Sequence, residues 1–273
     1  PRAAVAGNRI AEVLSTKTAI EEPESPKPFD MSKRGTVEFD HVSFRYPGAQ
    51  ENVLEDITFT AKPGQTTAII GSTGSGKSTL VHLIPRLYDI SQGKLLVDGI
   101  PVNQTSLYDL RERIGFVPQK GVLFTGTIAS NIRYGKENAS KEEIELAAQI
   151  AQAQDFIEAK EDQYEEPISQ GGGNVSGGQK QRLSIARAIA KHPEIYIFDD
   201  SFSALDYKTD AQLRRRLKQE TTDAAVIIVA QRISTILHAE QILVLDEGKI
   251  VGKGTHQELM EHCEVYRQIA ISQ

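Results

Sequence analysis

A glycine-rich loop with one lysine is the part of this sequence whose residue types and spacing point most directly to chemistry. Residues 71–79 read GSTGSGKST and match the pattern G-x-x-x-x-G-K-[ST]. Glycines allow tight backbone turns, so successive N–H groups can point at phosphate oxygens. Lys77 can reach the β- and γ-phosphates of a nucleotide, and the Ser78 hydroxyl can ligate Mg²⁺. The residues expected to contact the nucleotide are Gly71, Ser72, Thr73, Gly74, Ser75, Gly76, Lys77, Ser78 and Thr79.

A second glycine pair, about 100 residues further along the chain, offers another surface for phosphate oxygens. Residues 174–182 read NVSGGQKQR, which places Ser176, Gly177, Gly178 and Gln179 at the expected start of a helix. Free N–H groups at a helix N-terminus bind anions, although the same residues also fit a glycine-rich helix cap. One nucleotide does not need two such surfaces from one chain. Two chains facing head to tail would use both.

The phosphate loop requires a strand before it and a helix after it, and the sequence predicts both. Residues 66–70 are β-branched and apolar, which is typical of a buried strand, and a helix is expected through residue 87. Further buried strands are expected at 195–198 and 224–229. The glycine pair opens a helix that is expected to run from residue 176 to about 191.

Antiparallel signals surround this core. Residues 36–46 alternate apolar and polar side chains with a slip at His41, which predicts a strand with a bulge or two strand pieces. Residues 243–246 and 249–252 are expected to pair around a Glu-Gly turn. Ser140 and Glu143 form a capping box that opens a helix predicted to reach about residue 160. The expected fold is therefore α/β, with a parallel core, an antiparallel β layer and an inserted helical lobe near 121–190.

Composition limits the class of protein. The chain has 273 residues, of which 31 are basic and 37 acidic, so its formal net charge is −6. This mild acidity disfavours a nucleic-acid binder, and no apolar run approaches the length of a membrane span. Cys263 is the single cysteine, which fits a reducing compartment. The six histidines show no paired metal spacing, and the arginine run 214–216 is expected on a solvated helix face.

With the two glycine motifs in this order, the chain resembles the ATP-binding cassette (ABC) family, and the resemblance covers nearly all of residues 36–273. SGGQ followed by KQRLSIARA resembles the family's signature helix. GFVPQ at 115–119 resembles the Q-loop, and LFTGTI at 123–128 resembles its exporter version. The resemblance implies the fold of an ABC ATPase: a P-loop NTPase core, an antiparallel β layer and a helical subdomain.

The resemblance also implies roles for further residues. Tyr46, in FRYPG, is expected to stack on adenine, and Gln119 to touch Mg²⁺ and sense the γ-phosphate. Asp199 ends the Walker B strand and is expected to hold Mg²⁺ through water, which gives Mg²⁺ the ligand set Ser78, Gln119 and Asp199. Ser203–Asp206 resembles the D-loop at the interface between two cassettes. The residues expected to contact the partner's nucleotide are Ser176, Gly177, Gly178, Gln179 and Asp206.

Two positions depart from the family pattern. Asp200 stands where an active cassette has the glutamate that polarises the attacking water, and its carboxylate is retracted by roughly 1.5 Å. A displacement of about 1 Å can cost about 100-fold in rate. Gln231 replaces the switch histidine; its amide can hydrogen-bond a γ-phosphate but cannot carry a positive charge. With Lys77, these two residues form the expected catalytic group, and both substitutions indicate a degenerate site.

The two departures together resemble the non-catalytic half of a heterodimeric exporter. The site with this chain's P-loop would bind ATP well and hydrolyse it poorly. The other site would combine the partner's P-loop with this chain's signature, where Val175 replaces the usual leucine. Three alternatives remain: an active homodimeric exporter ATPase, an ATP-sensing regulatory module without turnover, and a soluble ABC ATPase of DNA repair or translation.

The first 30 residues are expected to differ from the rest. Residues 1–20 read as one helix, and residues 21–28, EEPESPKP, form a stiff linker. The resemblance implies that residues 1–30 are the end of the last transmembrane helix with its linker, and that 31–273 is the nucleotide-binding domain. It also implies that the chain is a fragment of a longer subunit. Expected partners are a second cassette from a different subunit and the transmembrane domains, at the cytoplasmic face of the cell membrane. Multidrug export is one of several compatible activities, and no nucleic-acid partner is expected.

Overall fold

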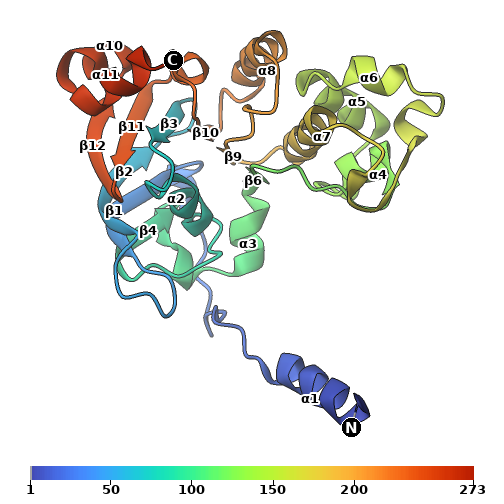
Figure 1. Cartoon of the computed structure of the whole chain (residues 1–273), viewed down its shortest axis with the longest axis horizontal. Coiled ribbons are helices and arrows are strands. Elements are labelled where there is room, and N and C mark those ends of the chain that lie inside the picture. The colour runs from blue at the N-terminus through green and yellow to red at the C-terminus, as the bar shows by residue number, and fades with distance from the viewer. Residues whose placement is uncertain (1) are drawn as a thin grey trace.

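The computed structural model describes residues 2–273 (Figure 1). Its α-helices are α1 Arg2–Ser15, α2 Lys77–Leu83, α3 Leu107–Glu112, α4 Ile128–Arg133, α5 Lys141–Ile150, α6 Gln154–Glu158, α7 Gly177–Ala190, α8 Tyr207–Glu220, α9 Ile233–Ile236, α10 His256–His262 and α11 Glu264–Ile271. Its strands are β1 Val37–Phe44, β2 Leu54–Ala61, β3 Thr66–Gly71, β4 Gln92–Val97, β5 Ile100–Pro101, β6 Ile114–Val117, β7 Gly126–Thr127, β8 Pro167–Ile168, β9 Ile195–Asp199, β10 Ala225–Val229, β11 Gln241–Asp246 and β12 Lys249–Gly254.

The central sheet has the order β12-β11-β3-β10-β9-β6, and all its pairings are parallel except that of β11 with β12. Successive side chains of a strand point to opposite faces, and here each face has its own core. Ile195 and Ile197 of β9 pack in the cluster that includes α2, whereas Tyr196 and Phe198 pack in the cluster that includes α7 and α8. Because both faces are covered, these strands are continuous apolar runs.

A second, antiparallel sheet of order β2-β1-β4-β5 shares the α2 core. Its aromatic residues Phe39 and Phe59 stack with ring centroids 4.7 Å apart. The predicted bulge in β1 is confirmed, because the register of its pairing shifts between Phe39 and Val42, and His41 has φ +52°. The predicted combination of parallel core, antiparallel layer and helical lobe is therefore confirmed.

The helical lobe is built from α4 to α7, and α7 packs against α4 and α5 (Figure 1). Ser140 and Glu143 form the predicted capping box at the start of α5. The prediction of one helix to about residue 160 is wrong, because α5 ends at Ile150. Gln152 adopts φ +57°, and the N–H of Ala153 donates to the carbonyl of Ala148 at 2.8 Å, which is a C-terminal helix cap.

The helix in the N-terminal segment is shorter than expected. α1 ends at Ser15 rather than near residue 20, and Figure 1 shows it projecting from the body of the molecule. The linker that follows reaches the body through the N–H of Lys27, which donates to the carbonyl of Gln104 at 2.7 Å. No helix among residues 2–273 is long and apolar enough to cross a bilayer. The domain limits near residue 30 and at 121–190 remain predictions.

Candidate nucleotide site

The candidate site lies at one edge of the central sheet, where four parallel strands end. β3 leads into the phosphate loop, β9 ends at Asp199, and Gln231 follows β10 by two residues. Gln119 follows β6. Because the carboxyl ends of parallel strands meet at one edge, segments from distant parts of the chain converge there, which is the usual position of ligands in open α/β sheets.

The phosphate loop has the backbone that its glycines predict. Gly74 and Gly76 have φ of +84° and +100°, a backbone region that residues other than glycine rarely adopt. Gly76 is the N-cap of α2, and no side chain caps that helix. The first N–H groups of α2 are therefore free to bind an anion, and the positive end of the helix faces the same place.

Lys77 lies folded back over the loop. Its Nζ donates to the carbonyls of Gly71 and Ser72 at 2.9 and 2.7 Å. Burial lowers the pKa of Lys77, and the nearby carboxylates of Asp200 and Asp199 oppose that effect. The ammonium group is thus held by backbone oxygens, next to the space inside the loop where a phosphate would bind.

Ser78 and Asp199 meet across the site. The Ser78 hydroxyl donates to Oδ1 of Asp199 at 2.8 Å, although the two residues are far apart in sequence. A hydroxyl and a carboxylate are oxygen ligands of the kind that Mg²⁺ prefers. These two residues fit a Mg²⁺ ion, whereas the amide of Gln119 is turned to Asp200. No cluster of three His, Cys, Asp or Glu side chains suited to a metal occurs among the described residues.

Asp200 accepts hydrogen bonds from both glutamines that the sequence singled out. Nε2 of Gln119 lies 3.0 Å and Nε2 of Gln231 2.5 Å from the same oxygen, Oδ2. The backbone of Asp200 is left-handed, with φ +48°. Burial raises the pKa of this carboxyl, and the Gln119 hydrogen bond partly offsets the rise. The structure therefore joins Asp200, Gln119 and Gln231 in one hydrogen-bonded group.

Tyr46 is placed against the start of α2 by its neighbours. Its ring contacts Phe44 and Tyr88 edge-to-face, with centroids 4.8 and 5.1 Å apart. Its hydroxyl shares a hydrogen bond with Oγ1 of Thr79 at 2.9 Å. The predicted aromatic platform and the phosphate loop are thus adjacent, because the antiparallel sheet packs on α2.

The second glycine motif lies in the helical lobe, away from the phosphate loop. Ser176 caps α7 in a capping box with Gln179, so both side chains are already hydrogen-bonded to each other's backbone N–H. Gly178 lies next to the carbonyl of Ala204, and Asp206 caps α8 by accepting from Thr209. Within residues 2–273, no hydrogen bond or ion pair joins this group to residues 71–79.

Sequence reasoning missed a buried glutamine that links α7 to the Q-loop segment. Nε2 of Gln181 donates to the carbonyl of Pro118 at 3.0 Å, and its Oε1 accepts from the N–H of Gly121 at 2.9 Å. Gln181 is almost completely buried. Gln181 lies four residues before Ile185 on a side of α7 that is buried, and a polar amide on a buried helix face is the signal that would have found it.

The solvated role expected for the arginine run is wrong for its first member. Arg214 is partly buried, and its Nε donates to Oδ1 of the buried Asp210 at 2.8 Å. Its NH1 donates to the carbonyl of Thr235 in α9 at 3.1 Å. Arg215 and Arg216 are exposed, as expected.

Comparisons with known proteins agree with this geometry. The family described as ABC transporter matches residues 54–203. The chain is 49% identical to an uncharacterized ABC transporter ATP-binding protein of Mycobacterium tuberculosis, covering 100% of this chain and 47% of that protein. It is 40% identical to the probable multidrug resistance ABC transporter ATP-binding/permease protein YheI of Bacillus subtilis, covering 96% of this chain and 44% of that protein.

Among solved structures, a bacterial Atm1-family ABC exporter with ATP bound superposes with a TM-score of 0.91 at 33% identity, covering 98% of this chain and 46% of that chain. The chain spans about half the length of the curated relatives that it matches. The fold is the ABC ATPase fold, with its antiparallel β subdomain and helical insert. The phosphate loop, the convergent strand ends and these matches together show that this chain is an ATP-binding domain of exporter type and belongs to the ABC transporter family.

Proposed function

We propose that this chain is the ATP-binding cassette of a membrane exporter subunit, and that its own site binds MgATP but hydrolyses it slowly. Binding would bring it together with a second cassette from a different subunit at the cytoplasmic face of the membrane. Hydrolysis at the partner's site would reopen the pair. The match to a probable multidrug resistance protein supports multidrug export as the activity of the assembly.

The proposal assigns nucleotide binding to groups that are already in position. The N–H groups of residues 71–79 and of the first turn of α2 would hold the phosphates, and Lys77 would exchange its two carbonyl partners for phosphate oxygens. Ser78 and Asp199 would hold Mg²⁺, which neutralises charge on the phosphates during phosphoryl transfer. The ring of Tyr46 would stack on the adenine.

The arrangement around Asp200 carries the proposal of slow hydrolysis. A general base must come within about 2.6–3.2 Å of the proton that it accepts. The aspartate side chain is one methylene shorter than glutamate, and its Oδ2 is tied to two amide donors. Burial raises the pKa of this carboxyl, but hydrogen bonds from these two amides stabilise the charged carboxylate and offset part of that rise, which makes it a weaker base toward water. Neither amide can take up a proton itself at neutral pH.

The signature residues support a pairing of two composite sites. The N–H groups of Gly177 and Gly178 start a 14-residue helix and have no hydrogen-bond acceptor among the described residues. They would complete the partner's nucleotide site, together with Ser176 and Gln179. Asp206 would lie at the same interface. This chain would therefore keep the signature residues that complete the nucleotide site of a catalytic partner.

Single-turnover hydrolysis of MgATP tests the proposal. The assembled transporter would carry a partner subunit whose own catalytic carboxylate is removed, so that turnover reports this chain's site. We expect slow hydrolysis in the native chain and at least about tenfold faster hydrolysis in the double variant Asp200→Glu, Gln231→His, because a longer carboxylate and an imidazole are restored.

The matched control makes the same two chemical changes at exposed positions, Asp223→Glu with Gln219→His, and should leave the rate unchanged. Equal and fast hydrolysis by the native chain and the double variant would contradict the proposal.

An active homodimeric cassette is a second candidate function. Burial raises the pKa of Asp200, and a base whose pKa lies closer to neutrality is better suited to accept a proton. The subunit stoichiometry of the purified transporter separates the two candidates, because the second one requires two copies of this chain. An ATP-sensing module would show slow ATP release without turnover at either site.

A further inference from the structure

The helix that follows Gln231 begins without a cap from its own sequence. α9 has four residues, and its N-cap is Arg232, whose side chain makes no capping hydrogen bond. An arginine side chain has donors but no acceptor, so it cannot satisfy the free N–H groups of a helix start. The Gln231 loop, defined here as residues 230–232, therefore leads into a short helix that needs an acceptor from elsewhere.

Gln273 supplies that acceptor from 40 residues away. Its Oε1 accepts from the N–H of Ile233 at 2.7 Å, and its Nε2 donates to the carbonyl of Gln231 at 2.6 Å. Both functions of one amide are thus used on the two backbone groups that flank Arg232. Gln181 holds the Gln119 segment with the same reciprocal pattern.

α11, which ends two residues before Gln273, is itself anchored. Tyr266 of α11 is completely buried, and its hydroxyl shares a hydrogen bond with Nδ1 of His256 at 2.8 Å. Ile269 and Ala270 pack against the core cluster that includes β10 and β11. The exposed residue Gln273 therefore follows closely on a helix that packs on the core.

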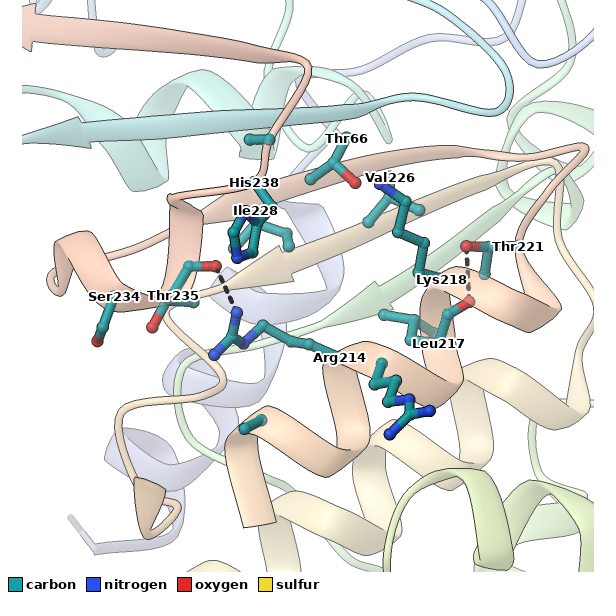
Figure 2. Close-up of a pocket in the computed structure, with 13 residues that line it drawn as sticks. Thr66, Arg214, Leu217, Lys218, Thr221, Val226, Ile228, Ser234, Thr235 and His238 are labelled. Atoms are coloured by element: carbon teal, nitrogen blue, oxygen red, sulfur yellow. Dashed lines mark hydrogen bonds between the residues drawn. The ribbon is translucent and has the colours of Figure 1, made fainter. Parts of the chain in front are cut away.

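The side of α9 that faces α8 borders a pocket, whereas Ile233 and Ile236 of α9 pack in the hydrophobic core. A cavity of about 440 Å³ separates α8 from α9 and β10, and Leu217, Ile228 and His238 line it (Figure 2). Across it, Arg214 donates to the carbonyl of Thr235 (Figure 2). The two buried isoleucines, the hydrogen bond from Arg214 and the amide of Gln273 together hold α9.

We propose that Gln273 is a positioning residue for the nucleotide site: its amide holds the Gln231 loop and thereby sets where the Gln231 side chain meets Asp200 and a γ-phosphate. The inference rests on the proposed binding of MgATP at this site, and on the expectation from the sequence that the Gln231 amide hydrogen-bonds the γ-phosphate. It assigns to α11 a part in discriminating ATP from ADP, since ADP lacks that phosphate.

Amide hydrogen exchange tests the first half in the assembled transporter without nucleotide. Losing one such hydrogen bond corresponds to roughly a two- to tenfold change in a local opening equilibrium. We expect Gln273→Ala to speed exchange of residues 231–236 by that factor. Gln273→Glu keeps an acceptor for Ile233 but loses the donor to Gln231, so its exchange should be intermediate.

The matched control is Gln268→Ala, at an exposed glutamine of α11 whose amide contacts Glu264 of the same helix. It should leave the exchange of residues 231–236 unchanged. Equal exchange in the native chain and Gln273→Ala, or equal loosening by Gln268→Ala, would overturn the inference. If Gln273→Ala does not fold, the similarly sized Gln273→Glu variant gives the same decision.

Nucleotide affinity tests the second half. We expect Gln273→Ala to weaken binding of MgATP to this chain's site about two- to tenfold, with MgADP affinity unchanged, whereas a merely structural role would weaken both. Gln231→Ala separates the two proposals. If it leaves the ratio of ATP to ADP affinity unchanged, the proposed function of Gln231 fails; if it changes the ratio and Gln273→Ala does not, the role of Gln273 fails.

Discussion

Asp98 is a completely buried carboxyl at the junction of the linker and the antiparallel sheet. Its Oδ1 accepts from the N–H of Gly35 at 2.7 Å, and its Oδ2 accepts from Arg113, which is shared with Glu194. Burial, together with the neighbouring Glu194 carboxyl, raises the pKa of Asp98 to about 6. The native chain therefore holds this proton more tightly than the unfolded chain does.

The pH dependence of stability follows from that shift. Because the pKa is raised on folding, the contribution of Asp98 to the free energy of unfolding falls as pH rises from about 4 to about 6. Asp98→Asn cannot ionise and escapes this loss. Urea unfolding at about pH 4.5 and pH 7 should show the variant gaining stability relative to the native chain at the higher pH. The exposed Asp223→Asn serves as control, and a difference that does not change with pH would contradict the prediction.

Two substitutions of Tyr46 separate the contribution of its ring to ATP binding from that of its hydroxyl hydrogen bond. Stacking of a base on an aromatic ring is worth about 1–3 kcal/mol. Tyr46→Leu should therefore weaken MgATP binding about tenfold, whereas Tyr46→Phe keeps the ring, loses the hydrogen bond to Thr79 and should change affinity much less. Titration calorimetry measures both variants. Tyr108→Leu, at an exposed tyrosine of α3, is the control, and equal losses in the Phe and Leu variants would rule out stacking.

At the scale of elements, two helices of the helical lobe begin with the same motif, a capping box. Ser140 caps α5 and Ser176 caps α7, each in a capping box, with Oγ accepting an N–H at 3.2 and 3.3 Å. The local chemistry is the same, but only α7 begins with a glycine pair next to the 203–206 segment. The two serines therefore allow a structural role to be separated from a role at the interface.

Removing either cap should cost about 1 kcal/mol of stability, or about 2–4 °C in Tm. We expect Ser140→Ala and Ser176→Ala to lower Tm by similar amounts. ATP turnover of the assembled transporter should fall in Ser176→Ala alone, because only that hydroxyl is proposed to contact the partner's nucleotide. Thermal unfolding and steady-state hydrolysis are the two measurements. Similar turnover in both variants would leave Ser176 as a cap alone.

At the scale of the whole molecule, the two halves of the proposed machinery are separated. α2 lies in the main body and α7 in the helical lobe (Figure 1). A single copy thus presents a phosphate loop and a signature helix that no hydrogen bond or ion pair connects among residues 2–273. The proposed composite sites between two cassettes would use both surfaces, and each site would then depend on residues of both chains.

Two variants of this chain should affect the transporter unequally. Ser176→Arg places a bulky side chain against the partner's nucleotide and should reduce steady-state ATP hydrolysis of the assembly at least about tenfold. Asp200→Asn removes the carboxylate from the slow site and should change it less than about twofold. Hydrolysis is measured in the purified complex, with Ser140→Arg as the control for charge and bulk at a helix cap. The reverse order of effects would show that this chain's own site hydrolyses ATP.

Local patterns of the sequence were enough to predict most elements that position the site. The phosphate loop, its flanking strand, the start of α2, the β1 bulge, the capping box of α5 and the start of α7 depend on residues close together in the chain, although α2 ends at Leu83 rather than at the predicted residue 87. The family pattern added Asp199, Asp200, Gln119 and Gln231. The local elements could be predicted because glycine conformation, strand periodicity and helix capping are decided within a few residues, whereas the roles of those four site residues stay predictions.

Contacts between distant segments were decided only by the tertiary structure. The hydrogen bond from Arg214 to Thr235 and the amide bridges of Gln181 and Gln273 join segments far apart in the chain, and they do not follow from local sequence. A glutamine has the same propensity whether its amide faces water or a partner's backbone, so its role depends on which segment the fold brings beside it. The sequence by itself determined the phosphate-binding loop, because its glycines and lysine lie within nine residues. Only the tertiary structure decided which distant side chains position the segments around that loop.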